Sequence, residues 1–275
     1  MKKLATGMIM AGMVLALAAC STNKEVAKDK STDWEKIEQK GEIVVGVDDT
    51  FVPMGFRDEN DELVGFDIDL AKAVAEELGV KAKIQPIDWS MKETELQNGT
   101  IDLIWNGYTV TEERKAKVAF TKPYLKNEQV IVTLKKNNIN DYEDMKGKVI
   151  GAQEGSSGEA NLIDEPELML DLVKDNEAVL YPTFMETFLD LNNGRLDGFI
   201  IDSVFAEYYI SKEDDPEKYV ILPSKFGEED YAVGARKEDK KTVDKINQAI
   251  KSLADQGKTQ EISMKWFNED KVLAQ

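Results

Sequence analysis

Apolar residues follow two kinds of spacing along the chain, continuous runs and helical periods. Residues 42–47 are a nearly continuous apolar run, typical of a buried strand, and residues 66–78 repeat apolar side chains at helical spacing before Gly79. In the second half, residues 148–152 predict a strand, followed by the small-residue loop 155–158 and a helical pattern. Each half therefore opens with strand, loop and helix.

A short segment occurs twice, and this repeat predicts the architecture. In residues 96–104 and again in residues 191–200, apolar positions at helical spacing lead into Asn-Gly, and an apolar strand follows. Further on, residues 231–235 predict a strand, and residues 243–253 an amphipathic helix. Helix, tight turn and buried strand in two copies predict an α/β fold with two lobes.

Ligands of open α/β sheets bind beyond the carboxyl ends of strands. The two repeated strands end at residues 106–109 and at Asp202-Ser203. We therefore expect both strand ends to face one cleft between the lobes, which closes by a hinge motion.

The first residues predict export and a lipid anchor. Lys2 and Lys3 precede an apolar stretch over residues 4–19, with the charge and length of a secretory signal. Residues 17–20, Leu-Ala-Ala-Cys, resemble a bacterial lipobox, so Cys20 is expected to carry a lipid as the mature N-terminus. The polar stretch that follows predicts a flexible tether, and the folded body is expected to begin near Trp34.

Composition excludes several classes of function. The net charge is −18, which disfavours nucleic acid as a partner and a basic patch as a membrane anchor. The sequence contains no histidine, so Ser-His-Asp and Cys-His nucleophiles and His-ligated metals are excluded. Its single cysteine, Cys20, cannot form an intramolecular disulfide. We expect no cofactor and no metal.

Five stretches in order resemble the polar amino acid family of bacterial solute-binding proteins that serve ABC importers. They are residues 46–53, 63–71, 109–114, 119–124 and 265–267. The resemblance covers residues 42–267 and implies a type II periplasmic-binding-protein-like fold, in which two mixed sheets flanked by helices are joined by two hinge strands.

This fold gives the expected boundaries. Residues 1–19 are the signal peptide, and 20–33 are the lipidated cysteine and tether. Lobe 1 comprises 34–127 and 225–275, and lobe 2 comprises 128–224, with hinges near residues 126–130 and 222–226. We expect a monomer on the outer face of the cell membrane that delivers an amino acid to the transmembrane subunits of an ABC permease.

A free amino acid needs a cation for its carboxylate and an anion for its ammonium. Arg114 lies in the first turn of a predicted helix that Thr111 can cap. The resemblance implies that Arg114 pairs with the ligand carboxylate and that Thr109 and the loop at Ser156 and Ser157 add donors.

The resemblance also implies the remaining contacts. Asp202 and the carbonyl of Gly107 are expected to bind the ammonium. Residues expected near the ligand side chain are Asp48, Phe51, Trp89, Tyr108 and Gln153. Trp105 and Asn106 replace the small residues more usual before Gly107, so the side-chain pocket is expected to be particular to this chain.

Three alternatives stay open. Arginine, glutamine and cystine are all compatible with these residues, and Asp48 or Asp49 could receive a cationic or amide side chain. Some proteins of this architecture are dehydratases of small acids that use a cleft carboxylate as general acid. A sensor or surface-adhesion protein could use the same two ligand contacts.

Overall fold

The computed structural model describes residues 33–275. The predicted signal peptide, Cys20 and nearly all of the predicted tether lie outside the described residues. Among the described helices, none is both long and apolar enough to cross a membrane.

Five strands form the first sheet. Its order is β5 (Lys81–Pro86), β1 (Glu42–Val47), β6 (Leu103–Ile104), β14 (Gly234–Arg236) and β7 (Val118–Phe120). β1 is parallel to β5 and β6, whereas β14 is antiparallel to β6 and β7. A small antiparallel sheet of β2 (Thr50–Phe51), β3 (Gly55–Arg57) and β4 (Leu63–Val64) lies in the same part of the body.

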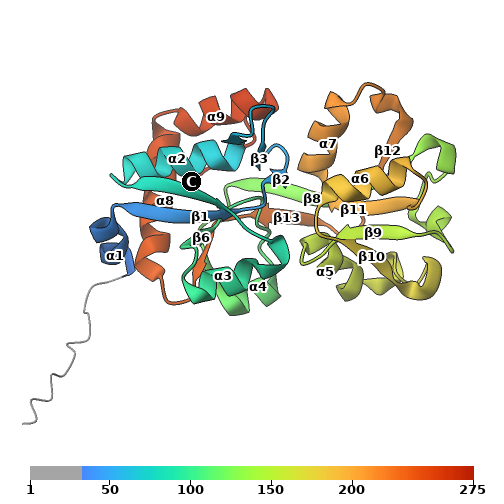
Figure 1. The fold of residues 1–275 in the computed structure, drawn as a ribbon, viewed down its shortest axis with the longest axis horizontal. Helices are drawn as coiled ribbons and strands as arrows, with labels where there is room; N and C mark the ends of the chain where they lie inside the picture. Colours follow the sequence, from blue (N-terminus) through green and yellow to red (C-terminus); the bar gives the residue numbers. More distant parts are fainter. Residues whose placement is uncertain (1–32) are drawn as a thin grey trace, which may run out of the picture. The chain divides into compact units, whose positions relative to one another are not determined.

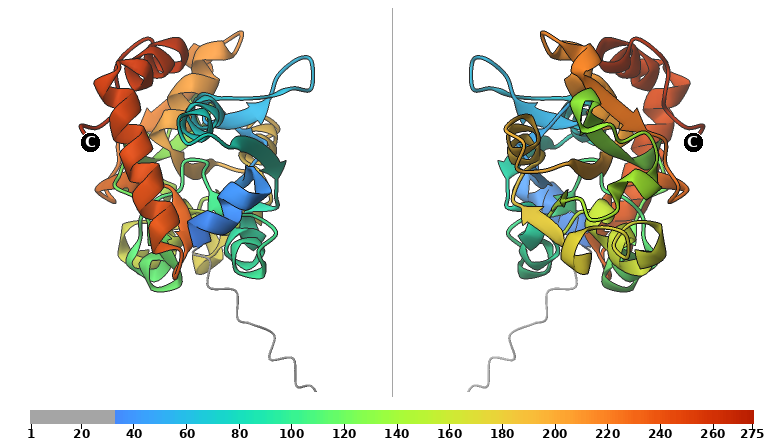
Figure 2. Two further views of the ribbon diagram at one scale, coloured as in Figure 1. Left: turned by 90° about the vertical axis from the view of Figure 1, so that its left-hand side faces the viewer. Right: turned by 90° about the vertical axis from the view of Figure 1, so that its right-hand side faces the viewer.

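Six helices belong to the same part of the body and pack on these strands or on one another. They are α1 (Asp33–Lys40), α2 (Phe66–Glu77), α3 (Lys92–Asn98), α4 (Glu112–Lys117), α8 (Lys240–Asp255) and α9 (Lys258–Phe267). The apolar face of α8 is buried, as its helical spacing predicted, and Figure 2 shows α1 lying beside α8. We call these helices and the two sheets lobe 1.

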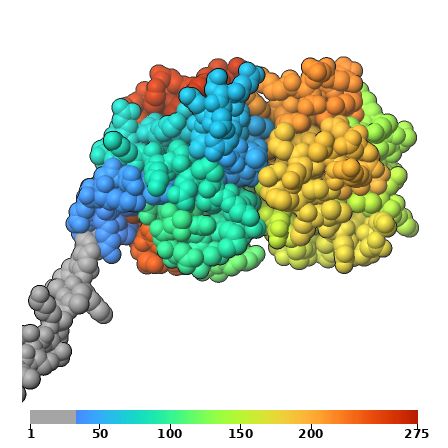
Figure 3. Space-filling model, in the orientation of Figure 1, coloured from blue at the N-terminus to red at the C-terminus, as the bar shows by residue number. Residues whose placement is uncertain are grey.

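The second sheet follows the order β10 (Ala178–Tyr181), β9 (Ile150–Gln153), β11 (Gly198–Asp202), β8 (Leu125–Leu134) and β12 (Tyr219–Leu222). Helices α5 (Ser157–Asp164), α6 (Phe184–Asn192) and α7 (Ser203–Lys212) pack on it. We call this sheet and its helices lobe 2. Figure 1 shows the two sheets in separate halves of the body, and Figure 3 shows the surfaces of the two halves meeting.

The predicted repeat is confirmed. α3 ends at Gly99, a left-handed glycine with φ 76°, and β6 follows; α6 leads through Gly194, with φ 72°, into β11. Left-handed backbone is accessible to glycine without strain, so each helix stops where the sequence predicts.

Strand β8 runs from one lobe to the other. Residues 125–128 pair with β13 (Glu228–Tyr231), and residues 129–133 pair with β11. The predicted hinge at 126–130 lies within β8, and the predicted hinge at 222–226 lies between the end of β12 and the start of β13. β8 and β13 thus form an antiparallel pair at the passage between the lobes (Figure 1).

The single strand predicted over 231–235 is wrong. β13 ends at Tyr231, and β14 begins at Gly234. Between them the chain leaves β8: the Ala232 amide donates to the Tyr108 carbonyl, and the Val233 amide donates to Thr121 Oγ1. An apolar run cannot reveal this change of partner, because residues 231–235 are buried throughout.

Candidate functional site

Arg114 lies where the sequence predicts, in the first turn of α4. The hydroxyl of Thr111 caps this helix, accepting from the Arg114 amide at 3.1 Å. The guanidinium is buried, packs over the Tyr108 ring at 4.6 Å from its centroid, and donates from Nη1 to the Thr109 carbonyl at 3.0 Å. A planar cation is therefore fixed in orientation on lobe 1.

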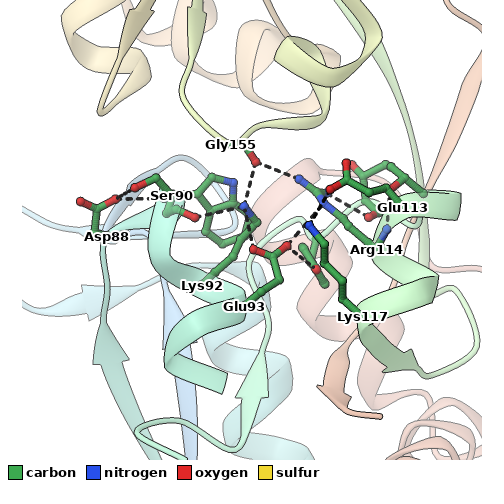
Figure 4. Close-up of polar contacts among 12 residues, drawn as sticks. Asp88, Ser90, Lys92, Glu93, Glu113, Arg114, Lys117 and Gly155 are labelled. Carbon is green, nitrogen blue, oxygen red and sulfur yellow. Dashed lines mark hydrogen bonds and ion pairs between the residues drawn. The ribbon is translucent and has the colours of Figure 1, made fainter. Parts of the chain in front are cut away.

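Two cations of lobe 1 meet one backbone carbonyl of lobe 2. Arg114 Nη2 donates to Gly155 O at 3.0 Å, and Lys92 Nζ donates to the same oxygen at 2.8 Å (Figure 4). Lys92 is 2 % exposed, and burial together with the nearby Arg114 lowers its pKa to about 8. Glu93 supplies the nearest negative charge, 3.5 Å from Lys92 and 3.9 Å from Arg114.

Hydroxyl groups from both lobes meet beside this contact. Thr109 Oγ1 lies 3.1 Å from Ser157 Oγ, and both residues are buried. Ser156 caps α5 by accepting from the Glu159 amide at 3.0 Å, so Ser157 stands in the first turn of that helix. A helix N-terminus presents amide donors to an anion.

Asp202 lies at the end of β11, buried among neutral donors. Its Oδ1 accepts from Asn127 Nδ2 at 2.6 Å, Gln129 Nε2 at 2.9 Å and the Tyr231 hydroxyl at 2.6 Å. Burial and the neighbouring Glu229 raise the pKa of Asp202 to about 7.

Gly107 is held by a buried acid. Its amide donates to Asp67 Oδ2 at 2.7 Å, and its φ is +56°. A Cβ at this position would lie 2.9 Å from the Phe51 ring, so only glycine fits here. Asp67 also accepts from the Tyr124 hydroxyl at 2.8 Å, and burial raises its pKa to about 7.

Asp48 and Gln153 form a polar contact across the lobes. Gln153 Nε2 donates to Asp48 Oδ2 at 2.7 Å and to the Pro182 carbonyl at 2.9 Å. Both side chains are buried, and burial raises the pKa of Asp48 above its ordinary value. Asp49 instead pairs with Arg57 at 2.6 Å in a more exposed position.

The three predicted aromatic residues occupy different surroundings. Phe51 of lobe 1 packs against two rings of lobe 2, with its ring centroid 5.8 Å from that of Phe184 and 5.2 Å from that of Phe205. Trp89 packs edge-on against Tyr108 at 6.0 Å, and the Tyr108 hydroxyl donates to Glu93 at 2.8 Å.

Trp105 and Asn106 are both buried. The Trp105 ring packs against Tyr124 at 6.3 Å in the hydrophobic core. The amide nitrogen and oxygen of Asn106 have no hydrogen-bond partner within the described part of the chain.

Several polar residues of the site were not predicted, among them Lys92, Asn127, Gln129 and Glu229. Lys92 follows the predicted Trp89 by three residues, yet an isolated lysine at the start of a helix is ordinarily exposed. Asn127 and Gln129 stand two residues apart on β8, so their side chains share one face of the strand. This spacing could have predicted that both belong to the site. Within residues 33–275, no group of three or more acidic residues could hold a metal ion.

Comparison with known proteins places the chain in one family of bacterial solute-binding proteins. The family model described as bacterial extracellular solute-binding proteins, family 3, matches residues 43–269. The arginine-binding extracellular protein ArtP of Bacillus subtilis (strain 168) is 31% identical, over 94% of this chain and 98% of ArtP.

Solved structures agree with this match. An ABC uptake transporter substrate-binding protein from Streptococcus pneumoniae, solved with bound histidine, is 49% identical with a TM-score of 0.87, over 89% of this chain and 99% of that one. The ancestral amino acid-binding protein AncCDT-1, a precursor of cyclohexadienyl dehydratase, is 32% identical with a TM-score of 0.76, over 85% and 98% of the two chains. The fold is thus common to this chain and these neighbours.

Proposed function

Because the chain belongs to family 3 of the bacterial extracellular solute-binding proteins, we propose that it binds a free amino acid outside the cell and delivers it to an ABC permease. The observation that carries the proposal is the pair of opposite charges at the lobe boundary. Arg114 is buried on lobe 1, and Asp202 is buried at the end of a lobe 2 strand. A carboxylate and an ammonium on one carbon match such a pair.

The ligand carboxylate binds at the Arg114 end of the site. Arg114 offers a guanidinium of fixed orientation, and Thr109 adds a hydroxyl from lobe 1. Ser156 and Ser157 bring the N-terminus of α5 from lobe 2, which favours an anion. A ligand that reaches both sets of donors joins the lobes.

The ligand ammonium binds at Asp202, with the Gly107 carbonyl as a second acceptor. Asp67 supports this role because its bond to the Gly107 amide fixes the direction of that peptide. The Asp202 carboxylate has neutral donors around it, and among the described residues it forms no ion pair. The ammonium supplies the missing positive charge.

The ligand side chain lies toward Asp48, Phe51, Trp89, Tyr108 and Gln153. The related proteins named above bind different amino acids, arginine in one and histidine in another. Arginine, glutamine and cystine all stay compatible with the acid, amide and aromatic groups of this chain. The buried Asp48 favours a side chain that can donate hydrogen bonds.

The protein is a monomer whose lobes close around the ligand. We place lobe 1 at residues 34–127 and 225–275 and lobe 2 at residues 128–224, with the passage through β8 and β13 as the hinge. Cys20 carries the lipid that holds the protein at the outer face of the cell membrane. Two acyl chains anchor a protein stably where one does not.

A thermal-shift screen of the twenty amino acids and cystine tests the proposal. A ligand at about a hundred times its dissociation constant stabilises the folded state by about 2.7 kcal/mol, which is a readily measured shift. Calorimetry then gives the affinity and a stoichiometry of one. If none of these compounds stabilises the protein, amino acid binding is refuted.

A second function, a small-acid dehydratase, is favoured by one observation. Asp202 is a buried carboxyl whose pKa of about 7 suits a general acid at neutral pH, and AncCDT-1 is a precursor of a dehydratase. Chromatography after prolonged incubation with small hydroxy acids and with the bound amino acid distinguishes the two. An unchanged compound favours binding without turnover.

A further inference from the structure

Asp202 and Glu229 share the same two amide groups. Asn127 Nδ2 donates to Asp202 Oδ1 at 2.6 Å and to Glu229 Oε2 at 3.1 Å. Gln129 Nε2 donates to the same two oxygens at 2.9 and 3.0 Å. Because each nitrogen is within hydrogen-bond distance of both oxygens, the two carboxylates lie side by side. We call them the acid pair.

No cation of the described chain compensates the acid pair. Neither carboxylate forms an ion pair with a lysine or arginine among residues 33–275. The other groups that face it are also neutral donors: the Tyr231 hydroxyl at 2.6 Å from Asp202, Asn161 Nδ2 at 2.9 Å from Glu229 Oε1, and the hydroxyls of Thr109 and Ser157. Burial raises the pKa of Tyr231, so this phenol stays protonated.

Two adjacent carboxylates in a water-poor site do not both ionise readily. Burial and the Glu229 charge both raise the pKa of Asp202, to about 7. In the empty protein near neutral pH, the pair is therefore stabilised by retaining one proton between its two members.

Glu229 also reaches the place proposed for the ligand carboxylate. Its Oε2 accepts from Thr109 Oγ1 at 3.2 Å and lies 3.4 Å from Ser157 Oγ. The ammonium and carboxylate of an α-amino acid are attached to one carbon. An ammonium bound at Asp202, with its carboxylate near Thr109, must therefore lie close to Glu229.

Resting on the proposed function, we infer that Glu229 is a second acidic contact of the ligand ammonium, and that the acid pair releases its shared proton when the ammonium enters. The proton passes to solvent, and the ammonium replaces it as the positive charge between the two carboxylates. Ligands without a charged α-ammonium, such as N-acyl amino acids, are then poor ligands even if their side chain fits.

Calorimetry tests this with L-arginine, L-glutamine and L-cystine, which titrate little between about pH 5.5 and pH 7. Titrations in two buffers of different ionisation enthalpy give the number of protons released. We expect wild-type protein to release up to about one proton below pH 7 and to bind up to about tenfold more tightly per pH unit as pH rises toward 7. Glu229→Gln should release fewer protons and bind about tenfold more weakly at about pH 8.

Glu228→Gln is the matched control, because Glu228 lies on the same strand with its side chain 77% exposed. It should behave as the wild type. Unchanged affinity and proton release in Glu229→Gln overturn the inference and leave the proposed function intact. Failure of all three amino acids to bind the wild type refutes the proposed function for these compounds instead.

A ligand-free measurement tests the acid pair by itself. Denaturant unfolding at about pH 5.5 and about pH 8 should show Glu229→Gln gaining stability relative to the wild type as pH rises, because the like charge is gone. An identical pH dependence in the two proteins overturns the shared proton. If the variant does not fold, wild-type proton release decides alone, and its absence below pH 7 overturns the inference.

Discussion

Replacing Arg114 by lysine keeps the positive charge and removes the forked donor. In the structure the guanidinium makes two hydrogen bonds of 3.0 Å, one to Thr109 O in its own lobe and one to Gly155 O in the other. It also lies over the Tyr108 ring, 4.6 Å from the ring centroid. A lysine ammonium is a point charge on a flexible stem and cannot reproduce this geometry.

The expected loss follows from the bonds removed. A hydrogen bond that involves a charged group contributes about 1.5–3 kcal/mol, and lysine forfeits at least one such bond to the protein or to the ligand carboxylate. Amino acid affinity should therefore fall about 10- to 150-fold in Arg114→Lys. Arg114→Ala, which leaves the ligand carboxylate without its cation, should cost about 2–5 kcal/mol, or roughly 30- to 4,000-fold.

Isothermal titration calorimetry with the amino acid identified by the thermal-shift screen measures both losses. Arg195→Lys is the control, because Arg195 lies 69% exposed in an ion pair with Asp190. It should bind as the wild type does. If folded Arg114→Ala binds within a few-fold of the wild type, the carboxylate does not lie at Arg114 and the assignment fails.

Three further predictions concern other parts of the chain. Lys92→Met should weaken affinity about tenfold by removing the 2.8 Å bond to Gly155 O, with Lys265→Met as an exposed control; equal affinities in calorimetry would show that this bond does not favour the closed form. Cys20→Ala should move the protein from the membrane fraction to the medium, and intact mutant that stays fully membrane-bound would contradict lipid anchoring. Asp67→Asn should flatten the pH dependence of unfolding. The pKa of Asp67 in the folded state, about 7, lies above its ordinary value of 3.8, so the wild type loses up to about 3 kcal/mol of stability as pH rises from about 4 to about 7. Parallel denaturation profiles of the two proteins would contradict this prediction.

Local periodicity was sufficient for most elements of lobe 1 and lobe 2. The run at residues 42–47 is β1, and the helical spacing after Gly65 is α2, because these patterns report burial on one side or on both. The apolar run at 231–235 failed for a related reason. Burial shows that a segment is covered, but it does not show which strand the segment pairs with.

The predicted site residues share a property that the sequence could indicate: they stand at strand ends and helix starts. Arg114 follows a capping threonine, and Asp202 ends a buried strand. Glu229 has no such signal, since it lies in a polar stretch that resembles a surface loop. Its contacts with Thr109 and Ser157 depend on how β13 pairs with β8, which is a long-range property.

The contacts between the lobes constrain how a ligand can act on the protein. The carbonyl of Gly155 already accepts hydrogen bonds from Arg114 and Lys92, and Gln153 already donates to Asp48 across the boundary. The empty protein thus has contacts of its own that favour approach of the lobes, so a ligand needs to supply only the remaining preference for the closed form. A carboxylate alone could bind Arg114 in an open form and would shift nothing. On the proposed function, the ammonium of an amino acid also binds Asp202, which forms no ion pair among the described residues, so a molecule that joins Arg114 to Asp202 gains from closure at both ends.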